Sequence, residues 1–311
     1  MSANIITIIN KYNTEAKCIA LLEQIRWGKT VTCVFCGSKK TKLLKGKSRR
    51  HSCQNCNHTF SVKMGTIFEG TPMPMHKWFL VIASMLNSKS GISAKELQRN
   101  YGLTYKTAYY TAMRVRIGML MPKTKLHGIL EMDEAYFGGK ARKKNGRENE
   151  ATLSSVVVKR GRGTKKISVA GIVERQGEIK TKVVEKLTKR NLLAFMKRSV
   201  KKDDSILITD GFRSYKKLDE YIEHLTINHS KQFSKGTTHI NTIEGFWSYV
   251  KSVSPKYLPM YLVQYEWQYN HRHNKGDLFL TYLKNALHHE KELQYWKAKD
   301  KQEVKEIAYE D

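Results

Sequence analysis

Apolar residues recur with a helical period in residues 1–30 and again from 76 to 121, and from about residue 125 the pattern changes to strands separated by turns and helices. A short helical pattern ends near Arg26-Trp27-Gly28, and further helices are predicted at 76–87, from Ser93, and at 104–121. Ser93-Ala94-Lys95-Glu96 is a capping box that opens the second of these three. A short helix, a glycine turn and a longer basic helix are typical of a helix-turn-helix, and a plain three-helix packing unit is the alternative.

The second part of the chain reads as strands and helices in a set order. Strands are predicted at 129–137, 155–159 and 167–174, a helix at 183–200, strands at 205–209 and 224–229, a helix at 241–251, and a helical tract at 259–294. Residues 138–155 read as a mobile basic loop. Three strands, helix, strand, helix, strand and helix is the order of the ribonuclease-H-like α/β fold.

Cysteine spacing predicts a metal site ahead of the helices. Cys33 and Cys36 form one CxxC knuckle, and Cys53 and Cys56 form a second one sixteen residues later. Four thiolates at this spacing are typical of a structural zinc site. Since the cysteines fill such a site, His51 and His58 are expected at the surface or facing DNA rather than on the metal.

Three acids, each in a strand or helix pattern, predict a second metal site. Asp210 ends the apolar strand Ile206-Leu207-Ile208-Thr209, where burial of a carboxylate is costly unless a cation meets it. Asp133 and Glu244 are the other two candidates, and oxygen donors of this kind suit magnesium. The choice of Asp133 stays open: Glu131 shares its strand face by alternation, Glu134 points the other way, and either could be a ligand or a supporting group.

The 241–251 helix is amphipathic in a way that suits this site. At about 100° per residue, Asn241, Glu244, Ser248 and Lys251 fall within one arc, opposite the apolar residues Ile243, Phe246, Trp247 and Val250. The helix therefore packs by its apolar face and presents a polar stripe. An ordinary solvated helix face is the alternative.

Charge decides the class of partner. The formal net charge is +28 and the pI about 9.8, which indicates a polyanion, most simply DNA. Lys106, Arg114 and Arg116 on the third predicted helix are the candidate DNA contacts, although the two arginines are about 200° apart around the helix. The longest largely apolar run, Phe79 to Leu86, is too short to span a membrane, and no signal peptide is apparent, so we expect a cytoplasmic protein at the nucleoid.

These motifs, in this order, resemble a zinc-ribbon branch of bacterial insertion-sequence DDE transposases. The resemblance covers residues from about 15 to 275 and rests on the following segments: Arg26-Trp27, the two CxxC knuckles, Met64-Gly65-Thr66-Ile67-Phe68, Glu131-Met132-Asp133-Glu134-Ala135-Tyr136-Phe137-Gly138-Gly139, Thr209-Asp210-Gly211, Asn241-Thr242-Ile243-Glu244-Gly245-Phe246-Trp247 with Lys251, and Tyr269-Asn270-His271-Arg272. It implies a catalytic site of Asp133, Asp210 and Glu244, with Asn241 and Lys251 beside the glutamate.

The resemblance also implies an activity. We expect a transposase that binds the terminal inverted repeats of an element as a homo-oligomer and uses Mg²⁺ or Mn²⁺ to cut the element ends and join them to target DNA. The expected domains are a helix and zinc ribbon at 1–70, a helix-turn-helix at 71–124, a ribonuclease-H-like catalytic domain at 125–295, and a charged tail at 296–311. A non-catalytic DNA-binding regulator and a structure-specific nuclease on the same fold are the rival functions.

Overall fold

The computed structural model describes residues 4–46, 49–122, 124–138, 166–215, 218–227, 239–250, 253–274 and 276–288. The chain divides into two compact units. The first runs from the N-terminus to Pro122 and includes the chain from Val263 on, and the second covers Lys123–Leu262. Lys251, the strand expected at 155–159, most of the expected basic loop and the expected tail lie outside the described residues.

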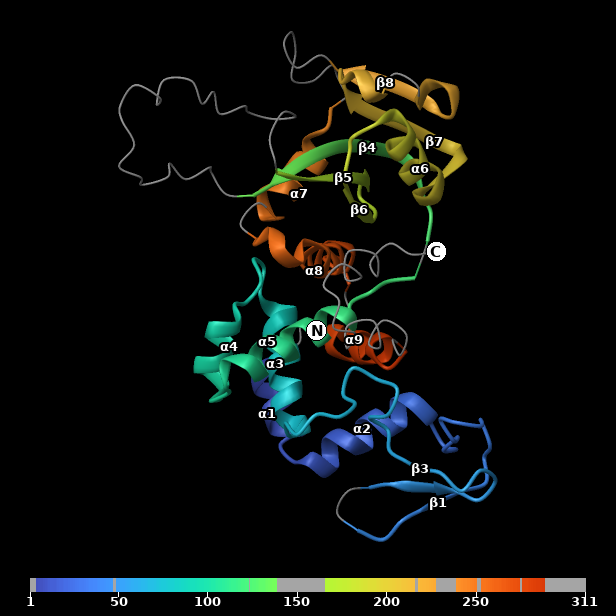
Figure 1. Ribbon diagram of the computed structural model, residues 1–311, viewed down its shortest axis with the longest axis vertical. Helices are drawn as coiled ribbons and strands as arrows, with labels where there is room; N and C mark the ends of the chain where they lie inside the picture. The colour runs from blue at the N-terminus through green and yellow to red at the C-terminus, as the bar shows by residue number, and fades with distance from the viewer. Residues whose placement is uncertain are drawn as a thin grey trace, which may run out of the picture. The chain divides into compact units, whose positions relative to one another are not determined.

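The first unit begins with two helices and a small sheet (Figure 1). Helix α1 spans Ile5–Lys11 and α2 spans Glu15–Trp27, which ends where the sequence predicted. Strands β1 (Thr41–Leu43), β2 (His51–Cys53) and β3 (Thr59–Phe60) form a three-stranded antiparallel sheet. Around it, Cys33, Cys53 and Phe60 are buried against Trp27, Val31, Val34, Cys56 and Met64, so the ribbon packs on the end of α2.

Three helices follow close to their predicted limits: α3 (Met75–Asn87), α4 (Ala94–Tyr101) and α5 (Tyr105–Ile117). The Ser93 side chain caps α4 by accepting from the Glu96 amide at 3.1 Å. Gly102 ends α4 with φ of 60° and ψ of 40°, a left-handed conformation that glycine adopts without a Cβ clash. The turn then leads directly into α5, whose first turn is capped by Thr104.

The helical tract expected at 259–294 is two helices, α8 (Leu258–Asn270) and α9 (Leu278–Ala286). Helix α9 is tied to the end of α5: Tyr282 Oη donates to the Val115 carbonyl at 3.1 Å, and Asn285 Nδ2 donates to the carbonyls of Gly118 and Leu120 at 2.9 and 2.6 Å. The chain beyond Val263 thus belongs to the first compact unit, whereas the sequence placed it with the catalytic domain. Sequence periodicity identifies a helix but not its packing partner.

The second unit is built on a five-stranded sheet with the order β6-β5-β4-β7-β8. The strands are β4 (Leu126–Phe137), β5 (Ile167–Glu174), β6 (Ile179–Val184), β7 (Val200–Asp210) and β8 (Glu223–Ile227). β4, β5 and β6 pair antiparallel, while β7 runs parallel to both β4 and β8. The first strand, β4, is therefore central, with antiparallel β5 and β6 on one side and parallel β7 and β8 on the other. This order confirms the predicted ribonuclease-H-like arrangement.

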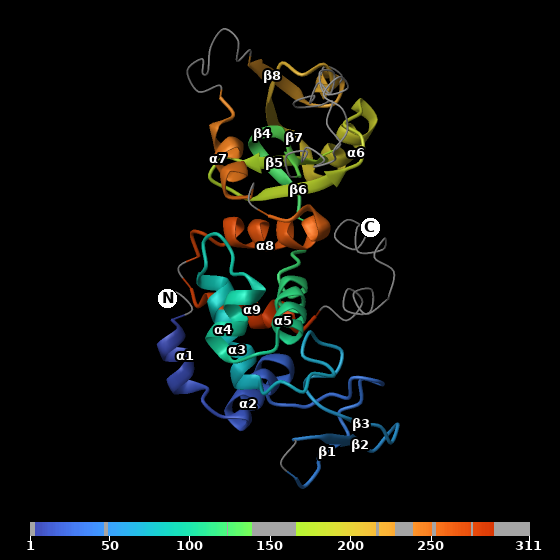
Figure 2. The same cartoon turned by 60° about the vertical axis from the view of Figure 1, so that its left-hand side comes forward.

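Helices cover the two faces of this sheet. Figure 2 shows α6 (Lys189–Ser199) and α7 (Asn241–Val250) on opposite sides of it. The α6 side holds a core that includes Leu130 and Met132 of β4, Ala170 and Ile172 of β5, and Leu192, Phe195 and Met196 of α6. The 3₁₀ turns η3 (Arg213–Tyr215) and η4 (Leu218–Glu220) follow β7, and η5 (Pro255–Tyr257) precedes α8. No helix in the described part of the chain is both long and apolar enough to cross a lipid bilayer.

The helix predicted at 183–200 begins later than expected, because β6 occupies residues 179–184. Ile179 and Thr181 are buried while Lys180 and Lys182 are partly exposed, which is the alternation of a strand, and Val184 is buried on the other face in the α6 core. This strand was not predicted from the sequence because two lysines dilute its apolar character.

Candidate functional site

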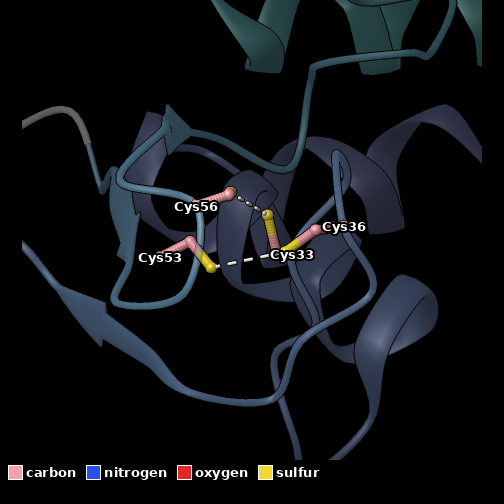
Figure 3. A group of neighbouring side chains, drawn as sticks. All are labelled: Cys33, Cys36, Cys53 and Cys56. Atoms are coloured by element: carbon pink, nitrogen blue, oxygen red, sulfur yellow. Dashed lines mark hydrogen bonds between the residues drawn. The ribbon is translucent and has the colours of Figure 1, made fainter.

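The four predicted zinc ligands converge in the ribbon. Figure 3 shows Cys33 and Cys36 from the first knuckle facing Cys53 and Cys56 from the second. Their sulfur atoms all lie within 4.8 Å of one another, and the pairs Cys33–Cys56 and Cys36–Cys53 are each separated by 3.6 Å. A zinc tetrahedron with bonds of 2.3 Å has sulfur–sulfur edges of about 3.8 Å, so the arrangement fits a closed four-thiolate zinc site.

The knuckle backbone also favours thiolates. The pKa of the Cys53 thiol is lowered to about 6, mainly by the backbone N–H of Cys56, and Asn55 N donates to the same sulfur at 3.4 Å. In the first knuckle, Phe35 N donates to Cys33 Sγ at 3.4 Å. A thiolate is the form that binds metal, so these donors prepare the site.

The two histidines beside the second knuckle differ in their surroundings. His51 is buried, and its Nε2 pairs with Glu23 Oε1 of α2 at 3.1 Å, so the prediction of a surface or DNA-facing role was wrong for it. Arg49 pairs with the same carboxylate at 2.5 Å. Glu23 therefore joins the ribbon to α2, a contact 28 residues apart that the sequence did not reveal. His58 is exposed, with Nδ1 2.9 Å from the Cys56 carbonyl oxygen.

The second candidate site lies on the α7 face of the large sheet. Alternation along β4 directs Leu130 and Met132 into the α6 core, so Glu131 and Asp133 face α7. Strand β7 pairs with β4 through Met132 and Thr209, which brings Asp210, the last residue of β7, beside Asp133 in the interior of β4. Asp210 Oδ1 accepts from Phe212 N at 3.1 Å, a contact that shapes the turn after the strand.

Glu244 is carried to the same face by α7. Helix α7 packs on β4 and β5 by its buried residues Ile243, Phe246, Trp247 and Val250, while Asn241, Glu244 and Ser248 are exposed, as the predicted stripe requires. A glycine makes the close approach possible: Gly171 pairs with Asp133 across the sheet, and a Cβ on it would lie 2.7 Å from Trp247 Cζ2.

Asp133 is influenced by its surroundings and by the other two acids. The pKa of Asp133 is raised to about 7, first by burial and then by the negative charges of Glu134, Asp210 and Glu244. Such repulsion is relieved by a cation, and the oxygen donors suit Mg²⁺ or Mn²⁺. Among the described residues, the four cysteines form the candidate metal-binding group, and the three carboxylates do not meet as closely as such a group requires without a bound ion.

The neighbouring glutamates have other partners. Glu134 points to the opposite face, where Tyr215 Oη donates to its Oε2 at 2.6 Å. Glu131 is fully buried and accepts from Arg175 Nε at 2.7 Å and from the first turn of α7. These contacts leave Asp133 as the β4 carboxylate that adjoins Asp210 and Glu244.

The predicted DNA contacts on α5 divide into two groups. Arg116 is 4% exposed, and its Nε donates to Gln264 Oε1 at 2.9 Å, so its prediction as a DNA contact was wrong in this fold. Arg114 is partly buried over the Trp78 ring, donates to the Glu69 carbonyl, and has a pKa lowered by burial. Lys106 is exposed at the start of the helix, between the exposed rings of Tyr105 and Tyr110.

Comparisons with known proteins agree with this picture. A family model described as ISXO2-like transposase domain matches residues 125–270, and one described as transposase zinc-ribbon domain matches residues 13–59. An uncharacterized transposase-like protein of Haemophilus influenzae is 33% identical over 109 residues, which cover 32% of this chain and 88% of that protein. An uncharacterized protein in transposable element ISH50 of Halobacterium salinarum is 27% identical over 245 residues, 76% of this chain and 82% of that protein.

Among solved structures, the Mos1 transposase paired-end complex with left transposon end matches with 14% identity and a TM-score of 0.29, covering 94% of this chain and 95% of that one. The Mos1 Strand Transfer Complex matches with 13% identity and a TM-score of 0.26, covering 98% and 92%. Both TM-scores are low, so the fold assignment rests on the strand order and pairing described above.

Proposed function

Because the chain belongs to the ISXO2-like family of insertion-sequence transposases, we propose that it cuts the ends of an insertion sequence and joins them to target DNA by metal-dependent phosphoryl transfer. The observation that carries the proposal is the placement of Asp133 beside Asp210 on adjacent parallel strands, on the sheet face that α7 covers with Glu244. Three carboxylates held by two strands and a helix suit the binding of hard divalent cations.

In this proposal the three acids supply the oxygen ligands of the catalytic ions. Divalent cations, when bound there, would stabilise the attacking and leaving oxygens of an in-line displacement at phosphorus. The paired parallel strands β4 and β7 hold Asp133 and Asp210, and α7 brings Glu244. Asn241 begins α7 on the same exposed stripe as Glu244 and is proposed to contact substrate. Lys251, outside the described residues, is proposed to add positive charge beside the phosphate.

The chemistry has two displacements. In the first, a water oxygen forms a bond to phosphorus at the element end and the P–O3′ bond breaks, which frees a 3′-hydroxyl. In the second, that hydroxyl attacks a phosphodiester of the target, and a target 3′-oxygen leaves. No covalent bond to the protein is formed. Since two element ends react together, we propose that the protein acts as a homo-oligomer on DNA.

DNA recognition is assigned to the first unit. The burial of Arg116 and the partial burial of Arg114 leave the start of α5 as its exposed part, with Tyr105, Lys106 and Tyr110. The first residues of a recognition helix are those that contact base edges in helix-turn-helix proteins. We propose Lys106 as a phosphate or base contact, flanked by the two tyrosines, and the formal net charge of +28 supports a polyanionic partner.

The test uses a labelled duplex that carries the inverted repeat flanking the gene. Wild-type protein with Mg²⁺ is expected to cut this end and to join it to a second duplex. Asp133→Ala, Asp210→Ala and Glu244→Ala should each lose roughly 100-fold or more of both activities, and double variants should lose little more, because the residues act as a unit. Binding of the duplex, followed in parallel, should persist.

Each alternative outcome has a distinct meaning. Cutting without joining would indicate a nuclease, and binding without cutting by the wild type would indicate a regulator. Normal cleavage by Asp210→Ala would overturn the assignment of the site. An inactive Glu131→Ala beside an active Asp133→Ala would move the first ligand by two residues.

A further inference from the structure

Helix α7 begins against a carboxylate from a distant part of the chain. Glu131 Oε2 accepts from the backbone amides of Thr242 and Ile243 at 2.9 and 3.1 Å, and its Oε1 accepts from Thr242 Oγ1 at 2.9 Å. Glu131 lies on β4, 111 residues before Thr242 in the sequence. The first amides of a helix need acceptors outside the helix and attract negative charge, so this carboxylate caps α7.

A cation completes the contact. Arg175, in the turn between β5 and β6, donates from Nε to Glu131 Oε1 at 2.7 Å and from a terminal nitrogen to the His239 carbonyl at 2.7 Å. Its guanidinium therefore joins the capping carboxylate to the segment that leads into α7. His239 Nδ1 is a further neighbour, 3.5 Å from the same Glu131 oxygen. Glu131 is 0% exposed, and a buried carboxylate needs such pairing and hydrogen bonds to be stable.

The position of this contact links two of the proposed metal ligands. Glu131 precedes Asp133 by two residues on the same strand face, and Thr242 precedes Glu244 by two residues on the helix. These separations are about 7 Å along a strand and about 3 Å along a helix. A local serine or threonine cap would attach the helix only to its own loop. A cap from β4 attaches it to the strand that carries Asp133.

We infer that Glu131, paired with Arg175, is a positioning residue that anchors the first turn of α7 to β4 and so sets the position of Glu244 relative to Asp133. The expected effect on metal binding rests on the proposed function. The contact between Glu131 and the first turn of α7 is present in the protein without DNA or metal. Glu131 is fully buried and is not open to a substrate. It acts through the helix it holds.

The first measurement is hydrogen–deuterium exchange of the full-length protein without DNA or Mg²⁺. In Glu131→Ala, amides 242–246 should exchange at least about tenfold faster than in the wild type, because the first turn loses its acceptors. Glu131→Gln keeps one carbonyl oxygen but not the charge, so its amides 242–246 should exchange at a rate between those of the wild type and Glu131→Ala. It replaces the alanine variant in the test if that variant folds poorly. Glu134→Gln, three residues away on the opposite face, is the matched control and should leave α7 protected.

The second measurement separates positioning from general stability. In Glu131→Gln, the Mg²⁺ concentration for half-maximal end cleavage should rise several-fold while binding of the end duplex is unchanged. Unchanged exchange of α7 in both Glu131 variants would overturn the anchor. If α7 loses its exchange protection in Glu131→Gln but the Mg²⁺ requirement is unaltered, the positioning role of Glu131 would be overturned. A wild type that binds but never cuts would refute the proposed function, while the exchange data would still decide the anchor.

Discussion

At the scale of single residues, three neighbouring acids of β4 have three different environments. Glu131 is fully buried and paired with Arg175, Asp133 adjoins Asp210 and Glu244, and Glu134 accepts from Tyr215 on the opposite face. Strand alternation separates Glu134 from the other two, but only the tertiary partners distinguish Glu131 from Asp133. An acidic side chain thus anchors a helix at one position of β4 and is proposed to bind metal at another.

Because the pKa of Asp133 is raised, replacing this carboxyl group with a neutral amide should stabilise the folded protein, and the gain should grow as the pH rises. Its folded pKa of about 7 lies above the ordinary value of 3.8, so the folded state favours the protonated form. Its contribution to stability is present below pH 4 and is lost as the pH rises through 7. In Mg²⁺-free buffer, Asp133→Asn should match the wild type near pH 4 and be more stable at pH 8, by an upper limit of about 4 kcal/mol.

Denaturant unfolding across this pH range measures the effect. Asp203→Asn removes a charge at an exposed position of β7 and serves as the control, with no comparable pH-dependent gain. An Asp133→Asn protein whose stability runs parallel to that of the wild type from pH 4 to 8 would contradict the prediction. Added Mg²⁺ should reduce the difference by stabilising the wild type alone.

At the scale of elements, α7 is fixed to the sheet at two places. Its first turn is held by Glu131, and its middle rests over Gly171, with the Trp247 ring 6.2 Å from that of Phe137. Helix α5 shows the same dependence on packing, since its second half is buried and its first turn is exposed. Burial therefore decides which part of each helix is available for substrate.

Gly171→Ala should displace α7. The added Cβ would lie 2.7 Å from Trp247 Cζ2, 3.0 Å from Cη2 and 3.2 Å from Ile243 Cδ1, so the helix or the strand has to shift. Overpacking of this kind costs about 1–3 kcal/mol, and end cleavage should fall with it. Gly245→Ala, on the exposed side of α7 with no atom within 4 Å, should be neutral or slightly stabilising. Full activity of Gly171→Ala would argue against close packing of α7 on β5.

Substitutions in the exposed first half of α5 and in its buried second half should have different effects. Lys106→Ala should weaken binding to the end duplex and, if it contacts phosphate, reduce the salt slope by about one unit without a change in Tm. Arg116→Ala should instead lower Tm, because it leaves the buried Gln264 without its partner. Filter binding at several salt concentrations and thermal unfolding separate the two. A Lys106→Ala protein with wild-type affinity and salt dependence would remove α5 from the interface.

At the scale of the whole molecule, the chain is organised as two compact units with different proposed tasks. The ribbon and the three helices α3, α4 and α5 share one unit with α9, and the carboxylates lie in the other. Glu23 ties the ribbon to α2 through Arg49 and His51. Loss of the ribbon should therefore affect the first unit and its contacts with DNA while the large sheet persists.

Zinc removal tests this division. The purified protein should contain one zinc per chain, and Cys36→Ala should lose it and unfold the ribbon, because structural zinc contributes about 10–16 kcal/mol in small zinc domains. End binding should fall, while exchange protection of β4, β5 and β7 is retained. Cys18→Ala is the matched control, since Cys18 is buried in α2 and donates to the Tyr12 carbonyl. Elemental analysis that finds no zinc in the wild type would contradict the assignment.

The sequence by itself determined whatever depends on local spacing. The CxxC knuckles, the helix periods of α3, α4 and α5, the polar stripe of α7 and the acid that ends β7 could all be predicted from it, because turns, helices and strands impose short, regular periods. The order of elements was sufficient to predict the ribonuclease-H-like sheet. The lysine-rich strand β6 was missed because its alternation is weak.

Only the tertiary structure decided which polar groups are buried against a partner and which face solvent. The burial of Arg116, the Glu23–His51 pair, the attachment of α9 to α5 and the capping of α7 by Glu131 all join residues far apart in sequence. A charged residue on a helix or strand looks the same in sequence whether it faces solvent or a buried partner. Its role is set by the element that packs against it, and that information is not local.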